Sequence, residues 1–227
     1  MVFKALVVDI DGTITNSDRT LDLRVAKKFR ELRVPVILST GNPLCYVHAV
    51  ARLIGISGMV IAENGGVIST GFDSPSIIAD GMEECEEAYD LLSRYFDLEK
   101  LDATYRKTEV VLRRGMDVSE LRRIVADNGM GVEIIDTGYA VHIKNKKMNK
   151  GTGLHTVSEL MGIQASDFLA IGDSCNDAEM MREAGLGIAV GNADDEARQA
   201  ASMITKASFG EGALEAIEYA LSNGLLE

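Results

Sequence analysis

The sequence has 227 residues, 46% of them hydrophobic and 26% charged, which is typical of a globular protein with one large domain or two modest ones. Its formal net charge is −12 and it has no concentrated run of Lys or Arg, which argues against a nucleic-acid partner because phosphate backbones require clustered positive charge. No segment approaches the roughly 18 apolar residues of a membrane span, and the first residues lack the apolar core of a secretion signal, so we expect a cytoplasmic protein without a membrane partner.

The N-terminal part of the chain alternates short apolar runs with amphipathic segments. A buried strand is expected from Ala5 to the acids Asp9 and Asp11, because this run is apolar, β-prone and bounded by Gly12. The same criteria predict strands over 36–38 and 59–62 and helices over 21–32 and 43–55. This strand–helix order predicts a parallel, doubly wound sheet.

The middle of the chain has a different order of predicted helices and strands. An acidic amphipathic helix is predicted from Glu83 onward. It is followed by a helix over 118–125 and strands over 110–112, 132–135 and 140–143. We therefore expect a small inserted α+β domain over 84–152, within an α/β core domain formed by 1–83 and 153–227.

After Lys150 the alternation of strands and helices resumes. Strands are predicted over 168–171, 188–190 and 203–204, with helices before, between and after them. The expected fold class is therefore α/β, with a doubly wound parallel core sheet and a small inserted α+β domain.

Two strands of this sheet are each followed by a pair of acids. Asp9 and Asp11 end the first strand, and Asp173 and Asp177 follow the strand over 168–171. Residues two apart on an extended chain face the same way, and parallel strands end at one edge of the sheet, so the four carboxylates are expected in one crevice. Each like-charged pair at ~4 Å costs about 4 kcal/mol at an effective dielectric of about 20, so oxygen ligands of this kind predict a hard cation such as Mg²⁺. Turn formation or helix capping explains single acids but not both pairs.

Two further positions suit the binding of a phosphate group. Thr40 follows the strand over 36–38 and precedes a helix, so its hydroxyl and nearby N–H groups can bind an anion, although it can equally serve as the helix N-cap. A lysine from the segment that returns to the core can supply a point charge. Composition does not choose among the four candidates, which are Lys144, Lys146, Lys147 and Lys150.

Taken together, these motifs resemble those of the haloacid dehalogenase-like phosphohydrolases. The match consists of DxDGT at 9–13, Thr40 in the second motif, Lys150 at the start of the third, and GDxxND at 172–177. The inserted domain lies where the type IIB cap of the Cof-like branch belongs, and the turn at 63–66 also resembles that branch. The resemblance implies a Rossmann-like core with a cap domain that contributes to substrate specificity.

The resemblance also implies roles for individual residues. Asp9 would attack phosphorus and carry an aspartyl phosphate, while Asp11 would protonate the leaving group and then activate water. Mg²⁺ would be held by Asp9, Asp173, Asp177 and the main-chain carbonyl of Asp11. The other expected site residues are Thr40, Gly41 and Lys150 for phosphate, with Asn64 and Asn176 in support.

The expected activity is Mg²⁺-dependent hydrolysis of a small phosphomonoester by a monomer or homodimer. The small cap and compact length resemble those of archaeal family members that act on phosphoglycolate, which makes 2-phosphoglycolate the expected substrate. Asn42 departs from the Arg that Cof-like relatives often carry after this glycine. Cap cations that could meet a substrate carboxylate, or simply face solvent, are Arg106, Arg113, Arg114, Lys144 and Lys146.

Two alternatives fit part of the pattern. A sugar-phosphate phosphatase or a phosphomutase would keep the same site and change the substrate or the acceptor. A non-enzymatic phospho-receiver also gathers acids, Thr and Lys around Mg²⁺ in a parallel sheet. Its phosphorylated aspartate lies in the middle of the chain, however, whereas here one acid pair ends the first strand and a second pair follows Lys150.

Overall fold

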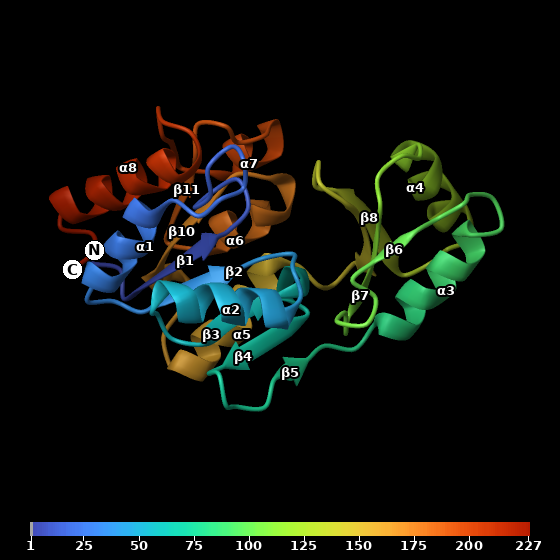
Figure 1. Ribbon diagram of the computed structural model, residues 1–227, viewed down its shortest axis with the longest axis horizontal. Coiled ribbons are helices and arrows are strands. Elements are labelled where there is room, and N and C mark those ends of the chain that lie inside the picture. The colour runs from blue at the N-terminus through green and yellow to red at the C-terminus, as the bar shows by residue number, and fades with distance from the viewer. Residues whose placement is uncertain (1) are drawn as a thin grey trace.

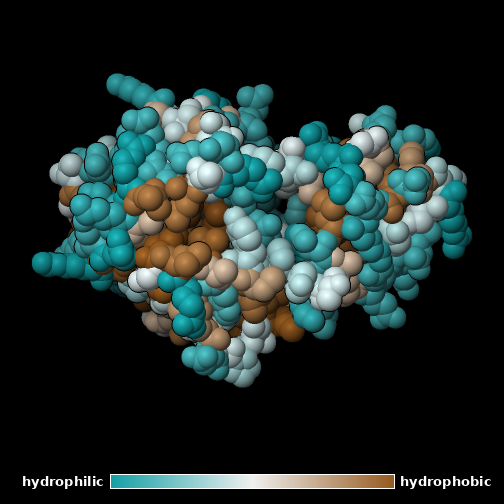
Figure 2. All heavy atoms as spheres, in the orientation of Figure 1, coloured by the Kyte–Doolittle hydropathy of each residue, from teal (hydrophilic) through white to brown (hydrophobic). Residues whose placement is uncertain are grey.

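The computed structural model describes residues 2–227, which form two lobes, each built on its own β-sheet (Figure 1). The larger sheet contains, in spatial order, β12 (Met203–Ile204), β11 (Leu186–Ala189), β10 (Phe168–Gly172), β1 (Ala5–Asp9), β2 (Val36–Ser39), β3 (Met59–Ala62), β4 (Val67–Thr70) and β5 (Ile77–Ile78). The smaller sheet contains β6 (Lys100–Leu101), β7 (Glu109–Leu112), β9 (Val141–Asn145) and β8 (Val132–Asp136). On the face shown in Figure 2 most of the surface is hydrophilic, with a large apolar region on the larger lobe and smaller apolar areas elsewhere.

The larger sheet is parallel from β12 to β3, and its faces are covered by helices on both sides. Alternate residues of β1 enter different cores: Leu6 and Val8 join one hydrophobic cluster, while Ala5 and Val7 join the other. The first cluster includes residues of α1 (Leu23–Glu31), α2 (Leu44–Ile54) and α8 (Phe209–Ser222). The second includes residues of α5 (Lys150–Met161), α6 (Ala178–Glu183) and α7 (Asp195–Ala200). The predicted doubly wound α/β fold is therefore confirmed.

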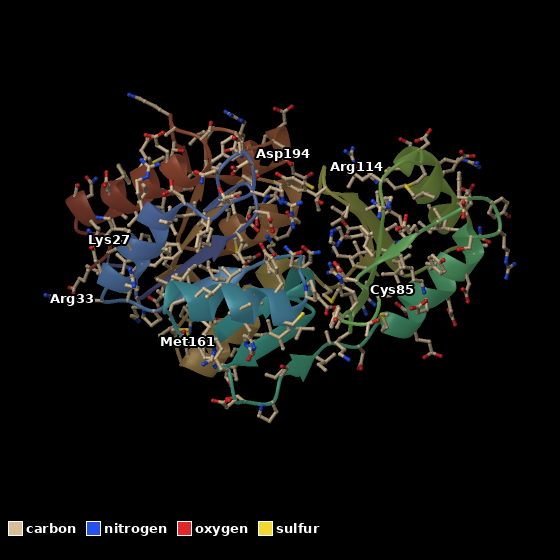
Figure 3. All side chains as sticks on the ribbon, viewed as in Figure 1. Lys27, Arg33, Cys85, Arg114, Met161 and Asp194 are labelled. Carbon is tan, nitrogen blue, oxygen red and sulfur yellow. The ribbon has the colours of Figure 1, made fainter. Side chains whose placement is uncertain are left out.

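The smaller lobe packs two helices on one face of its sheet. Cys85 of α3 (Met82–Leu92) and Leu121 of α4 (Val118–Asp127) share a core with Val110 and Leu112 of β7. Cys85 lies inside this lobe (Figure 3). Because side chains alternate along a strand, Val111 faces the other way, and it lines a cavity together with Asp9 of the larger lobe. The helix-free face of the smaller sheet therefore covers the carboxyl edge of the larger one.

The limits of the inserted domain follow from two helices. The helix α3 begins at Met82 and packs on the smaller sheet, whereas α5 begins at Lys150 and packs on β3 and β4. The boundaries expected from sequence, after residues 83 and 152, each fall inside one of these helices. We propose to divide the chain before Met82 and before Lys150, which keeps both helices intact.

Three strands were not predicted from the sequence. The strand β4 runs antiparallel to β3, β5 pairs with β4, and β6 pairs with β7. β5 and β6 have only two residues each, too few for an alternating pattern to emerge. β4 follows directly on a turn that contains two glycines, and the Val67-Ile68 pair after such a turn is a hairpin signal.

Candidate active site

Three of the expected acids meet at the carboxyl edge of the larger sheet. β1 and β10 are adjacent and parallel, with Val8 opposite Ile171, so Asp9 and Asp173 leave the sheet side by side. Asp177 is brought to them by the 3₁₀ turn Cys175–Asp177. One carboxylate oxygen from each of Asp9, Asp173 and Asp177 lies within 4.8 Å of the others, and all three residues are buried.

Lys150 provides the positive charge inside this group of acids. Its Nζ lies 2.6 Å from Oδ1 of Asp9 and 2.6 Å from Oδ1 of Asp177, and its side chain is 0% exposed. Burial opposes the charge of the lysine, but Asp177 and Asp9 together raise its pKa above the ordinary value. The side chain is placed by the start of α5, where Asn149 caps the helix by accepting a hydrogen bond from the N–H of Thr152. Of the four lysine candidates, the structure thus brings Lys150 to the acids.

One ammonium does not neutralise three carboxylates. Burial raises the pKa of Asp9 to about 7, because the lowering effect of the Lys150 charge does not offset burial together with the negative charge of Asp177. Burial and the neighbouring Asp9 and Asp177 raise the pKa of Asp173 well above its ordinary range. Among the described residues, Oδ2 of Asp9 is a buried oxygen without a hydrogen-bond partner. An all-oxygen ligand set with excess negative charge and a free buried oxygen fits a hard divalent cation such as Mg²⁺.

Gly12 allows the two acidic loops to approach each other closely. It has a φ of +91°, and a Cβ at this position would lie 2.3 Å from Oδ2 of Asp173. The hydroxyl of Thr13 donates to Oδ1 of Asp173 at 2.9 Å, and the Nδ2 of Asn192 donates to the carbonyl of Gly12 at 3.0 Å. The Gly-Thr pair of the first motif therefore orients Asp173. No pattern in the sequence singles out Asn192, because it lies in a loop with no recognised motif.

Asp11 lies apart from the other three acids. Its Oδ1 accepts a hydrogen bond from Nη2 of Arg19 at 2.9 Å, and its Oδ2 accepts one from Nδ2 of Asn42 at 2.6 Å. The expectation of four carboxylates in one group is corrected to three, because β1 ends at Asp9 and the extended alternation does not continue to Asp11. Asp11 nevertheless lines the same cavity as Asp9. Asn42, which departs from the family pattern, contacts the expected acid–base residue directly.

Thr40 and Gly41 lie at the end of β2, beside the acids. The hydroxyl of Thr40 accepts a hydrogen bond from the N–H of Asn42 at 3.1 Å. Thr40 does not cap α2, because the N-cap is Pro43. The carbonyl of Gly41 accepts a hydrogen bond from Nη1 of Arg106, in the smaller lobe, at 2.5 Å. Thr40 and Gly41 thus lie in the cavity wall, where a phosphate group could reach them.

Asn64 and Asn176 belong to a buried network that joins the lobes. The Nδ2 of Asn176 donates to Oδ1 of Asn64, and Nδ2 of Asn64 donates to Oε2 of Glu109, both at 2.9 Å. Glu109 also contacts Nδ1 of His142 at 3.1 Å and Nη1 of Arg106 at 2.5 Å. Neither Glu109 nor His142 was expected at the site from the sequence, although for Glu109 a charged residue at the start of an otherwise apolar strand is a usable signal.

The cap cations considered from the sequence have different surroundings. Arg106 is buried and lines the cavity that contains Asp9. Lys144 is also buried, but its Nζ contacts Oε2 of Glu133 at 3.0 Å and the carbonyl of Met148 at 2.5 Å. The remaining three are exposed and lie outside that cavity: Arg113, Arg114 and Lys146. Of the five, Arg106 alone lines the cavity of Asp9.

The cavity lies between the lobes and is small. Its volume is about 180 Å³, and its lining includes Asp9 and Asp11 from the larger lobe and Arg106, Tyr139 and His142 from the smaller lobe. Pockets for drug-sized ligands usually measure about 300–1,000 Å³. The space beside Asp9 therefore suits a compact substrate.

Comparison with known proteins agrees with this geometry. The family model described as haloacid dehalogenase-like hydrolase matches residues 6–109 and 117–217. The chain belongs to this family. The resemblance inferred from the four motifs is thereby confirmed, and the phospho-receiver alternative is set aside.

Similar proteins of the haloacid dehalogenase-like family include two archaeal relatives named phosphoglycolate phosphatase. That of Methanococcoides burtonii is 75% identical over 226 residues, covering 100% of both chains. That of Methanosarcina mazei is 54% identical over 224 residues, covering 99% of both chains. Identity of this extent over the whole length identifies the chain as a phosphatase, a phosphoric monoester hydrolase.

Solved structures support the fold independently. A crystal structure of Thermoplasma acidophilum protein 0175 superposes with a TM-score of 0.87 at 23% identity, covering 96% of this chain and 98% of the other. At this identity the likeness bears on the fold alone. Within residues 2–227, no helix combines the length and apolar character needed to cross a bilayer.

Proposed function

We propose that this phosphatase hydrolyses 2-phosphoglycolate to glycolate and phosphate, with Mg²⁺ and through an aspartyl phosphate on Asp9. The observation that carries the proposal is the buried Oδ2 of Asp9, which has no hydrogen-bond partner among the described residues and belongs to a residue that lines a cavity of about 180 Å³. The relatives named phosphoglycolate phosphatase support the choice of substrate.

In the first step Asp9 acts as the nucleophile. Its free oxygen forms a bond to phosphorus while the bond between phosphorus and the glycolate oxygen breaks, which leaves the phosphoryl group on Asp9. Asp11 donates a proton to the departing oxygen, so that glycolate leaves as an alcohol. Asp11 is suited to this role because it lines the cavity and is oriented by Asn42 and Arg19.

In the second step water attacks the phosphoryl group. Asp11, now deprotonated, accepts a proton from the water, the bond from Asp9 to phosphorus breaks, and inorganic phosphate is released. Lys150, Thr40 and Gly41 would bind the phosphate oxygens during both steps, since Lys150 contacts Asp9 directly and the other two line the same cavity.

Asp9, Asp173, Asp177 and the main-chain carbonyl of Asp11 would hold the metal ion. Mg²⁺ bound there supplies positive charge, which allows a carboxylate to approach a phosphate dianion. The proposal places the reaction in the cytoplasm, on a small phosphorylated metabolite, without a nucleic-acid or membrane partner and in a monomer or homodimer.

A phosphate-release assay tests the proposal. The purified protein is given 2-phosphoglycolate, a series of sugar phosphates and other phosphorylated metabolites, with Mg²⁺ or with EDTA. We expect Mg²⁺-dependent release with water as the acceptor and the highest kcat/KM for 2-phosphoglycolate. Preference for a sugar phosphate would refute the substrate, and transfer to a sugar hydroxyl without phosphate release would indicate a phosphomutase.

The nucleophile is tested with Asp9→Asn. We expect its turnover to fall by roughly a thousandfold or more while its circular dichroism spectrum stays unchanged. Asp73→Asn serves as the control, because Asp73 is an exposed loop residue outside the cavity. Substantial Mg²⁺-dependent turnover by the Asp9 variant would remove Asp9 as the nucleophile.

A further inference from the structure

Three residues that can carry positive charge line the cavity beside Asp9: Arg19, Arg106 and His142. Two of them are already engaged by one carboxylate. Arg106 lies 2.5 Å from Oε1 of Glu109, and Nδ1 of His142 lies 3.1 Å from Oε2. Because Glu109 is fully buried, removing its partners would leave a buried charge uncompensated. Arg106 and His142 therefore both have a structural role toward Glu109, although the buried Nε of Arg106 has no hydrogen-bond partner among the described residues.

Arg19 is placed differently. Its side chain is 51% exposed, and its Nη2 donates to Oδ1 of Asp11 at 2.9 Å. A guanidinium group has five N–H donors, and within residues 2–227 this is the hydrogen bond that the side chain of Arg19 makes. The remaining donors are available to a molecule in the cavity.

The ring of Tyr139 holds the guanidinium of Arg19 in place. The Cζ of Arg19 lies 4.4 Å from the ring centroid of Tyr139, which belongs to the loop between β8 and β9 of the smaller lobe. Stacking on an aromatic face fixes the plane of a guanidinium and leaves its N–H edge free for bidentate contact with a carboxylate. Since Arg19 comes from the larger lobe, this arrangement requires both lobes.

The backbone of Arg19 also adopts a conformation that is uncommon for its residue type. Its φ is +68°, in the left-handed region that non-glycine residues rarely occupy. The turn that imposes this φ is closed by hydrogen bonds from the N–H of Asn16 to the carbonyl of Thr20 and from the N–H of Arg19 to the carbonyl of Asn16. Conformations of this kind persist where surrounding contacts fix them, and they concentrate at functional sites.

We propose that Arg19 is a specificity-determining residue that binds the carboxylate end of the substrate, with Tyr139 as the surface against which its guanidinium stacks. The proposal rests on the proposed function, because it assigns the second anionic group of a substrate whose phosphate lies at Asp9. Asp11 keeps a partner when Arg19 turns to the substrate, since Asn42 still donates to its Oδ2 at 2.6 Å.

The test compares two substrates that differ in the group that Arg19 is proposed to bind. 2-Phosphoglycolate carries a carboxylate, and 2-hydroxyethyl phosphate carries a neutral hydroxyl in its place. For Arg19→Gln we expect kcat/KM to fall roughly ten- to hundredfold for 2-phosphoglycolate, mainly through KM, because a charge-assisted bidentate contact is lost. For 2-hydroxyethyl phosphate we expect a clearly smaller loss, because the variant removes one of the two contacts that orient Asp11 but no contact with the hydroxyl of this substrate. Arg19→Lys should restore part of the loss, since it keeps the charge without the planar fork.

Arg113→Gln is the matched control. Arg113 is also an exposed arginine bound to a carboxylate, that of Glu99, but it lies outside the cavity of Asp9. We expect it to leave both substrates unaffected. An equal loss for both substrates in Arg19→Gln would overturn the proposal, because it would show that Arg19 acts through Asp11 and not on the carboxylate.

A binding measurement separates this inference from the proposed function. Titration of both ligands into Asp9→Asn and into the Asp9→Asn, Arg19→Gln double variant needs no turnover. We expect the double variant to lose affinity for 2-phosphoglycolate selectively. If the double variant loses affinity for 2-phosphoglycolate selectively but the wild type hydrolyses neither ligand, the proposed reaction is refuted and the role of Arg19 is not. If the affinity is unchanged, the role of Arg19 is refuted and the proposed reaction is not.

Discussion

The Nζ of Lys150 lies 2.6 Å from Oδ1 of Asp9, although 141 residues separate them in the chain. The same ammonium group lies 2.6 Å from Asp177, so one buried cation ties the end of β1 to the turn after β10. The acids and the lysine are therefore interdependent: each is tolerated in the interior because of the others.

The first prediction concerns Lys150→Met. Removing the lysine leaves Asp9 and Asp177 buried without their cation, so we expect the free energy of unfolding without metal to fall by about 3–5 kcal/mol. Urea denaturation in EDTA measures it. Lys147→Met is the control, because Lys147 is exposed in the same segment and should change stability by less than about 0.5 kcal/mol. Equal stability of the two variants would show that Lys150 does not compensate the acids.

The second prediction concerns metal binding. We expect Mg²⁺ to raise the Tm of the wild type, because a ligand at 100 times its Kd stabilises the native state by about 2.7 kcal/mol. Asp173→Asn removes a member of the acid group and should abolish most of this rise, whereas Asp73→Asn should retain it. Thermal denaturation with EDTA and with increasing Mg²⁺ gives the shift. A full shift in Asp173→Asn would place the ion elsewhere.

The third prediction separates the effect of backbone strain at a glycine from the effect of a steric clash between a new Cβ and its neighbours. Gly12→Ala combines a positive φ with a Cβ 2.3 Å from Oδ2 of Asp173, whereas Gly162→Ala has a φ of +68° and no atom within 4 Å of the new Cβ. Both should lose about 1–2 kcal/mol of stability to backbone strain. Gly12→Ala alone should also lose the Mg²⁺-induced rise in Tm and the phosphatase activity. If Gly12→Ala retained both, the close approach of the loops would not matter for the site.

The fourth prediction concerns acid stability. Burial would raise the pKa of Glu109, but His142 and Arg106 outweigh it and hold the pKa below the ordinary value of 4.5. A carboxyl whose pKa is lowered by folding stabilises the protein at higher pH, and this stabilisation is lost as pH falls through the folded-state pKa. We therefore expect Glu109→Gln to be less stable than the wild type by about 3 kcal/mol at neutral pH, with the difference shrinking below pH 4.5.

Urea denaturation at several pH values measures this difference. Glu159→Gln is a suitable control, because Glu159 is exposed on α5 and should give no difference at any pH. A constant gap between Glu109→Gln and the wild type down to pH 3 would contradict the assigned ion pairs.

The arrangement of the acids was predictable where it follows from strand geometry. Asp9 and Asp173 each end an apolar run, and parallel strands deliver their ends to one edge of a sheet, so their proximity could be inferred before the structure. The position of Asp11 could not, because it depends on where β1 stops and on two partners, Arg19 and Asn42, that a turn brings close. Side-chain direction beyond the end of a strand is set by local contacts that have no periodic signal.

The contacts between the lobes could not be predicted from the sequence either. Helix and strand periods reveal which face of an element is buried, but not which separate element covers it. In the sequence, Glu109 is a single charged residue at the edge of an apolar strand, and His142 is an isolated histidine. Their meeting with Asn64 depends on how two independently patterned sheets face each other.

The contact between Arg106 and the carbonyl of Gly41 has a consequence for the timing of the reaction. It ties the smaller lobe to the loop that follows β2, and the chain of Glu109, Asn64 and Asn176 ties it to the loop that follows β10. Because these contacts must break before the lobes separate, we expect lobe opening to limit the release of both products. Acid-quenched reactions should then show a rapid first formation of glycolate followed by a slower steady rate.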